Sequence, residues 1–261
     1  MVVAHADDET LLAGALIAKL VSIGHEVSVL CLAPGGGERT QRLRNACEVL
    51  GVSSVETFRY TGGVMWPEDT GSPETRPSQA HLRENGGDDR TLAPVLATAP
   101  VGDLAGRIGG RISENDPDIV ITHSRYGDYG HADHAATHLA TVLAFETSAS
   151  ERSRLYALAW PSFLVSLNGR LMKIGGRDIR RMGPNGQFDL LQAINVAATA
   201  RSLVPGGTDV TVRVADMLKV RRAASRWYAD EMSRGPLPLR ILERLPVWLQ
   251  RTVLGRARLT L

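Results

Sequence analysis

Four of the seven histidines in the chain lie within the segment 123–138, where the run 131–134 reads His-Ala-Asp-His. A second run of metal-ligand residue types, His-Ala-Asp-Asp-Glu at 5–9, directly follows the apolar residues 1–4. Each run comes just after an apolar, strand-like stretch. Imidazole and carboxylate groups gathered in this way are typical of a metal-dependent or acid–base site, whereas a lone histidine is more often structural.

We expect His5, Asp8 and His134 to form a metal site. Residues just beyond the carboxyl ends of neighbouring strands converge in an open parallel sheet, so two segments far apart in the chain can meet there. Two imidazoles and one carboxylate suit Zn²⁺, one per chain, with a fourth position left for water. Neither Cys31 nor Cys47 lies in a ligand-like pair, which argues against a closed structural zinc site and against a disulfide framework.

Two further groups are candidates for proton transfer. Zinc would activate a water molecule and polarise a carbonyl oxygen. Asp7 is adjacent to the ligand Asp8 but cannot point in the same direction, so we predict that it is the general base for that water. A second protonatable group must serve the leaving nitrogen or the oxyanion, and His131, beside Asp133, fits this role.

The elements that must position these residues alternate between helix and strand along the first 160 residues. The sequence predicts helices over Leu11–Ile23, Glu38–Leu50, about Val101–Glu114 and up to about Glu146. It predicts strands over Val27–Leu32, Val55–Tyr60, Asp118–Thr122 and about Leu155–Trp160. A long helix is predicted over Val212–Met232. This alternation is typical of an α/β fold. We therefore expect a Rossmann-like, mostly parallel sheet with helices on both faces and the active site at the carboxyl ends of the strands.

We expect one domain over residues 1–232, with a long loop at 61–100, and a separate basic segment over 233–261. The loop is rich in Gly, Pro, Ser, Thr, Asp and Glu, which is typical of a binding loop or of a surface excursion. The last segment has six arginines and one acid interleaved with apolar residues. Packing on the domain or on a second subunit of a homo-oligomer is the favoured interpretation, and contact with an anionic membrane is the alternative.

The two histidine-containing runs also resemble the motifs of a known family. Residues 4–9, Ala-His-Ala-Asp-Asp-Glu, are similar to the AHPDDE motif of the PIG-L (LmbE-like) N-deacetylases, and residues 127–134, Gly-Asp-Tyr-Gly-His-Ala-Asp-His, are similar to their GxYGHPDH motif. The resemblance extends to about residue 145. Members of this family are zinc hydrolases that remove acyl groups, usually acetyl, from N-acylglucosamine units in phosphatidylinositol glycans, mycothiol and bacillithiol precursors and glycopeptide antibiotics.

On this chain, the resemblance implies the same three metal ligands and the same base. It further implies that His131, oriented by Asp133, stabilises the tetrahedral intermediate or protonates the amine, and that Tyr129 polarises the carbonyl. Arg39 corresponds to a sugar-contacting arginine, although Arg42 stands where the family has a glutamate.

Two departures concern the loops that carry the site. Ala6 and Ala132 stand where the family usually has proline. The replacement removes no ligand but leaves both loops less restrained.

From these residues we expect a zinc-dependent hydrolase that removes an N-acyl group, most simply acetyl, from an N-acylglucosamine conjugate. The alternatives are an amidase of mycothiol-type thiol conjugates and a catalytically silent carbohydrate-binding module on the same fold. All but three of the 30 basic residues are arginine, which indicates a GC-rich genome and favours antibiotic or other specialised-metabolite biosynthesis.

The net charge and the hydropathy of the chain limit which partners and which cellular compartment we expect. The net charge of +2 argues against a nucleic-acid partner. No apolar run is long enough for a transmembrane helix, so we expect a cytoplasmic protein, with peripheral membrane association as the alternative.

Overall fold

The structure is a computed structural model of the 261-residue chain. It describes residues 1–62, 94–125, 127–159, 181–182, 188–189, 210–234 and 237–260, so most of the expected 61–100 loop lies outside the described residues. The strands are β1 (Val2–His5), β2 (Ser28–Ala33), β3 (Ser54–Thr57), β4 (Ile119–Thr122), β5 (Arg154–Ala159), β6 (Arg181–Met182), β7 (Phe188–Asp189), β8 (Val210–Arg213) and β9 (Arg256–Thr260). The helices are α1 (Asp8–Leu11), α2 (Gly14–Ser22), α3 (Gly37–Leu50), η3 (Leu96–Thr98), α5 (Val101–Asn115), α6 (Gly127–Gly130), α7 (Ala132–Ser148), α10 (Leu218–Ser225), η4 (Arg226–Tyr228), α11 (Ala229–Arg234), α12 (Leu237–Arg244) and α13 (Val247–Leu254).

The strands place both histidine-containing runs at one edge of the sheet. Strands β1, β2 and β3 form one hydrogen-bonded sheet, and all three are parallel. A second sheet has the order β4-β5-β9-β8, in which β4 and β5 are parallel and β9 is antiparallel to both β5 and β8. Strand β1 lies beside β4, and the Ala4 N–H donates a hydrogen bond of 2.9 Å to His123 Nε2 just after β4. The carboxyl ends of β1 and β4 therefore meet, which confirms the predicted α/β fold with a parallel sheet.

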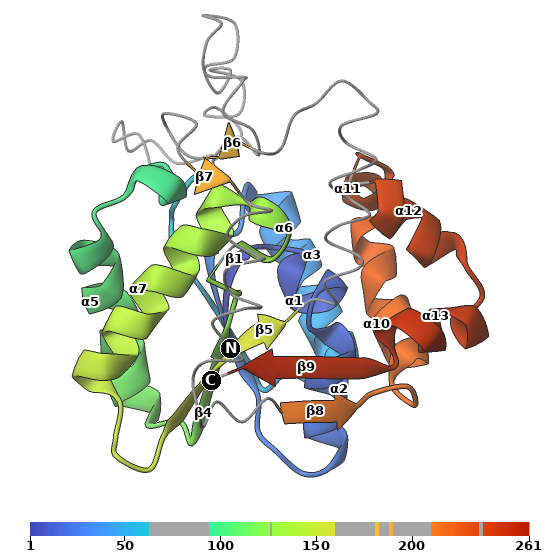
Figure 1. The fold of residues 1–261 in the computed structure, drawn as a ribbon, viewed down its shortest axis with the longest axis horizontal. Helices are drawn as coiled ribbons and strands as arrows, with labels where there is room; N and C mark the ends of the chain where they lie inside the picture. Colours follow the sequence, from blue (N-terminus) through green and yellow to red (C-terminus); the bar gives the residue numbers. More distant parts are fainter. Residues whose placement is uncertain are drawn as a thin grey trace, which may run out of the picture.

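Helices cover both faces of this sheet, as Figure 1 shows. Alternate residues of a strand point to opposite faces. Val3 and Cys31 accordingly belong to the core cluster under α2, α3 and α10, whereas Ala4 and Leu32 belong to the cluster under α5 and α7. Both cysteines are buried free thiols.

The C-terminal third differs from the sequence-based expectation. The predicted helix over Val212–Met232 begins later than expected, because the β-branched run Val-Thr-Val at 210–212 belongs to a strand, β8, and the helices α10, η4 and α11 occupy residues 218–234 after a turn at Asp216. The segment 233–261 supplies two helices that pack against α10 and α11, and it ends in β9, which lies between β5 and β8. Among the described residues, no helix is both long and apolar enough to cross a membrane.

Candidate metal and catalytic site

The first half of the site is the turn between β1 and α1. His5 ends β1, Asp8 begins α1, and Asp7 between them has a φ of 122°. Such a backbone conformation costs about 1–3 kcal/mol in a residue other than glycine, and strain of this kind is concentrated at functional sites. The His5 N–H donates to Asp8 Oδ2 at 2.9 Å, so this turn is held by one of its own site side chains.

The second half of the site is the turn between β4 and α7. His131 is the N-cap residue of α7, and its Nδ1 accepts a hydrogen bond from the Asp133 backbone N–H at 3.2 Å. His134 follows in the first turn of the helix and is fully buried, as is Asp133. The short helix α6 before them carries Asp128, whose φ is 63°.

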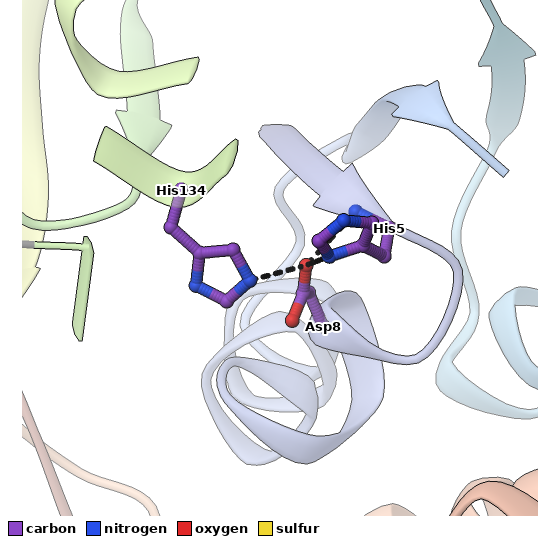
Figure 2. A group of neighbouring side chains, drawn as sticks. All are labelled: His5, Asp8 and His134. Carbon is purple, nitrogen blue, oxygen red and sulfur yellow. Dashed lines mark hydrogen bonds and ion pairs between the residues drawn. The ribbon is translucent and has the colours of Figure 1, made fainter. Parts of the chain in front are cut away.

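Figure 2 shows His5, Asp8 and His134 pointing toward one another from these two turns. Asp8 Oδ2 lies 3.4 Å from His5 Nδ1 and 3.3 Å from His134 Nε2, and the three ligand atoms form a group that could hold a metal ion. Ligands bound to zinc at about 2.0 Å in a tetrahedron are about 3.3 Å apart. The donor set and its spacing therefore fit the expected Zn²⁺ site.

Carboxylates hold the outward-facing nitrogens of both imidazoles. His5 Nε2 lies 2.8 Å from Asp133 Oδ2, and His134 Nδ1 lies 2.9 Å from Asp128 Oδ2. A carboxylate partner of this kind fixes the proton on the nitrogen that faces it and leaves the lone pair of the other nitrogen for a metal. In both rings that other nitrogen faces Asp8, which is the arrangement that two ligating histidines need.

Asp133 contacts two histidines of the site. Its carboxylate oxygen Oδ2 lies 2.8 Å from His5 Nε2, and its backbone N–H donates a hydrogen bond of 3.2 Å to His131 Nδ1. The orientation of His131 by Asp133 stays a prediction, and the contact with His5 is one that the sequence did not indicate.

Asp128 and His123 also belong to the site, although the sequence gives no direct sign of a role for Asp128. Asp128 Oδ2 lies 2.5 Å from His123 Nδ1, and His123 stacks on His134 with ring centroids 4.0 Å apart. Because His123 Nε2 accepts the Ala4 N–H, the ring carries its proton on Nδ1 and donates it to Asp128. The signal that could have identified Asp128 is the need of a ligating histidine for a carboxylate near its second nitrogen.

The carboxylates around the centre favour a cation there. Burial by itself would lower the pKa of His134, but Asp8 and Asp128 raise it to about 10. Burial would also raise the pKa of Asp8, yet the charge of His134 and the hydrogen bonds from His134 and His5 hold it well below its usual value. The same field that retains a proton on His134 would stabilise a bound metal ion.

Asp7 has the environment of a general base. Burial and the neighbouring Asp8 raise the pKa of its carboxyl to about 6, even though Arg39 lowers it. Arg39 Nη2 donates to Asp7 Oδ2 at 3.1 Å and to the Ala6 carbonyl at 2.7 Å. A base with a pKa near neutrality can accept a proton and release it at physiological pH. The expected contact of Arg39 with sugar stays a prediction.

His131 lies beside the ligands and is neutral. Burial and the nearby His134 and His5 hold its pKa well below the usual value, and its ring centroid lies 4.7 Å from that of His134. Because Nδ1 accepts the Asp133 N–H, the neutral ring carries its proton on Nε2. His131 is therefore arranged as a hydrogen-bond donor rather than as a charged acid.

The remaining candidates lie at the margin of this group. The side chain of Tyr129 lies outside the described residues. Arg42, which replaces the family's glutamate, pairs with Glu231 of α11 at 3.0 Å and with Glu38 at 2.5 Å. His138 lies beyond the ligand group, with its Nδ1 2.8 Å from the His123 carbonyl oxygen.

The parallel sheet and the histidine–carboxylate cluster at its carboxyl edge define an α/β protein with a candidate metal centre. The profile of the PIG-L family, described as GlcNAc-PI de-N-acetylase, matches residues 1–145. The chain therefore belongs to the PIG-L family, as its motifs indicated.

Two curated relatives carry the same name, 1D-myo-inositol 2-acetamido-2-deoxy-alpha-D-glucopyranoside deacetylase. The protein of Tsukamurella paurometabola is 32% identical over 173 residues, which are 58% of this chain and 55% of the relative. The protein of Mycobacterium sp. strain JLS is 27% identical over 244 residues, which are 89% of this chain and 73% of the relative. The chain thus spans little more than half the length of the first of these relatives.

A solved structure shares the fold over nearly the whole chain. The zinc-inhibited form of teicoplanin deacetylase Orf2 superposes with a TM-score of 0.56 at 16% identity, covering 99% of this chain and 97% of that protein. At this level of identity the likeness establishes the common fold.

Proposed function

We propose that this protein is a zinc-dependent N-deacylase that removes an acetyl group from an N-acetylglucosamine conjugate. The observation that carries the proposal is the convergence of His5, Asp8 and His134, in which Asp8 Oδ2 lies 3.4 Å from His5 Nδ1 and 3.3 Å from His134 Nε2, with Asp7 beside them. Membership of the PIG-L family and relatives named as deacetylases of an acetamido sugar support the same reaction. One zinc ion per chain is the cofactor that this ligand set suits.

The chain's own residues supply the proton transfers. A bound zinc ion provides Lewis-acid chemistry that polarises the amide carbonyl and activates water. Asp7 accepts a proton from the attacking water and, once protonated, returns it to the leaving nitrogen. His131 donates its Nε2–H to the oxygen of the tetrahedral intermediate, where negative charge develops.

The substrate class follows from the relatives rather than from the site alone. Mycothiol-pathway relatives act on a small inositol conjugate of the sugar, and the zinc-inhibited structural neighbour is a teicoplanin deacetylase. Because all but three basic residues are arginine, as in GC-rich genomes, we favour a conjugate of specialised metabolism, such as an antibiotic precursor. A panel of N-acetylglucosamine conjugates, scored by acetate release, identifies the preferred one.

The Asp7→Asn variant tests the general base. We expect kcat to fall about 10²- to 10⁴-fold, while the zinc content stays at the wild-type level because Asp7 is not among the proposed ligands. Acetate release and metal analysis on the same preparation measure both quantities. A variant that retains both its zinc and full activity would overturn the assignment of Asp7.

The two alternatives differ from this proposal in their products. An amidase of mycothiol-type thiol conjugates would release an acid larger than acetate, which mass spectrometry of the products detects. A silent carbohydrate-binding module would bind the conjugate in the presence of Zn²⁺ and release no acid. The strained Asp7 beside a complete ligand set favours the enzyme.

Two exposed apolar side chains of the C-terminal segment could contact a membrane or a second copy of the chain. Ile241 is 50% exposed and Trp248 67% exposed, although the helices that carry them pack against the domain. Substituting both residues by serine leaves the buried side of these helices unchanged. Sedimentation with anionic vesicles and size-exclusion chromatography of that variant, compared with the wild type, test the two contacts separately.

A further inference from the structure

The peptide group between Ala6 and Asp7 is held at both ends. Its carbonyl oxygen accepts a hydrogen bond of 2.7 Å from Arg39 Nη2, and its N–H donates one of 2.9 Å to Glu9 Oε2. The orientation of this peptide group defines φ of Asp7, which is 122°. The two hydrogen bonds therefore restrain the unusual backbone conformation of the proposed base.

Glu9 can hold that N–H because it is itself fixed. It is fully buried, and its Oε1 accepts hydrogen bonds from Tyr228 Oη at 2.9 Å and from Thr10 Oγ1 at 2.6 Å. Tyr228 is also fully buried and lies in η4, beyond the segment that matches the family profile. The C-terminal part of the chain thus reaches the turn that carries Asp7 through the carboxylate of Glu9.

We propose that Glu9, anchored by Tyr228, is a positioning residue that fixes the Ala6–Asp7 peptide and thereby aims the Asp7 carboxylate at the reacting water. The inference rests on the proposed function of Asp7 as the base. Glu9 does not touch the water or the substrate, and it acts only through the direction of its neighbour.

Two substitutions at Glu9 and one at Tyr228 test this role. Glu9→Leu removes the acceptor of the Asp7 N–H and should lower kcat about 100-fold, since a small displacement of a catalytic group has effects of this size. KM and zinc affinity should stay within about twofold of the wild type. Glu9→Gln keeps one acceptor oxygen and should restore most of the lost kcat, and Tyr228→Phe should lower kcat about fivefold, as expected for the loss of one hydrogen bond.

Placing Glu9→Leu in the Asp7→Asn enzyme distinguishes a positioning role of Glu9 from a general loss of folding stability. If Glu9 acts through Asp7, Glu9→Leu should change the residual kcat of the Asp7→Asn enzyme less than about twofold, because the two effects are not additive. Gln250→Leu is the matched control, since Gln250 is buried and its side-chain amide donates to carbonyls in the C-terminal helices. It should lower the melting temperature without changing kcat.

The proposal is overturned if Glu9→Leu lowers kcat equally with and without the Asp7 carboxylate, or if it lowers only the melting temperature. Amide hydrogen exchange at Asp7 gives a readout that does not depend on activity. The Asp7 N–H should exchange slowly in the wild type and rapidly in Glu9→Leu, and equal exchange would reject the restraint. If Asp7→Asn is fully active, the base assignment fails, while the exchange measurement still decides whether Glu9 holds this peptide group.

Discussion

At the scale of single residues, Asp128 links two histidines of the β4–α7 connection, His123 directly after β4 and His134 in the first turn of α7. One of its oxygens faces both His123 Nδ1 and His134 Nδ1, while the other accepts the Ser124 N–H at 3.0 Å. Asparagine cannot reproduce this pattern, because its amide nitrogen would face either the two imidazoles or the Ser124 N–H, and both positions require an acceptor.

We predict that Asp128→Asn weakens zinc binding about 10- to 100-fold, the usual effect of removing the hydrogen-bond partner of a ligand. Competition with a chelating dye measures the affinity. Asp216→Asn removes the same charge from a surface ion pair with Lys19 and should leave the affinity unchanged. An Asp128→Asn protein that binds zinc as tightly as the wild type would show that Asp128 does not orient His134.

Zinc binding should also release protons. The carboxylates hold the pKa of His134 at about 10, so its ring is protonated near neutral pH, whereas a ligating imidazole must be neutral. The apparent affinity should therefore fall as the pH is lowered, by about tenfold per pH unit for each proton displaced. Calorimetry in buffers of different ionisation enthalpy measures the number of protons released, and an affinity that does not change between pH 6 and pH 8 would contradict this prediction.

At the scale of elements, helix α5 offers a direct comparison between two glycines. Gly106 is exposed, with nothing within 4 Å of the position that a Cβ would occupy, whereas a Cβ at Gly109 would collide with the Ser148 side chain of α7. Gly106→Ala should stabilise the protein by about 0.5–1 kcal/mol, since it reduces the entropy of the unfolded chain. Gly109→Ala should destabilise it by about 1–3 kcal/mol. Urea denaturation measures both, and equal effects would contradict the packing of α5 on α7.

The elements also show which features a sequence can predict. Helix α3 and strand β2 follow from apolar patterns, and the convergence of the three proposed ligands follows from residue types placed after strands. The partners of those ligands do not, because contacts such as Asp133 with His5 depend on the angle at which α7 meets β1. The alternation Arg-Ala-Arg-Leu-Thr is compatible with the strand β9 that the structure has there. The arginines and the neighbouring helical pattern instead favoured the prediction of an amphipathic segment.

At the scale of the whole molecule, the C-terminal segment contributes a strand to the sheet and packs against the domain. Strand β9 pairs with both β5 and β8, and among the described residues it is the strand that joins β8 to the rest of this sheet. Arg221 of α10 forms a buried ion pair with Glu243 of α12, and its Nη2 also donates to the Leu11 carbonyl at 3.1 Å, at the end of the helix that begins with the proposed ligand Asp8. Loss of the segment would leave Arg221 as an uncompensated buried charge.

We therefore predict that a chain ending at residue 236 does not fold cooperatively. Removal of β9 exposes the edges of β5 and β8, and removal of α12 leaves Arg221 without its carboxylate. Far-ultraviolet circular dichroism with urea denaturation tests this, with the Ile241→Ser, Trp248→Ser double variant as a control that changes only exposed side chains. A truncated protein with the wild-type denaturation midpoint would show that the first 236 residues fold without the segment. If the full-length chain unfolds cooperatively and the truncated chain does not, the candidate metal site and the C-terminal helices belong to one folding unit.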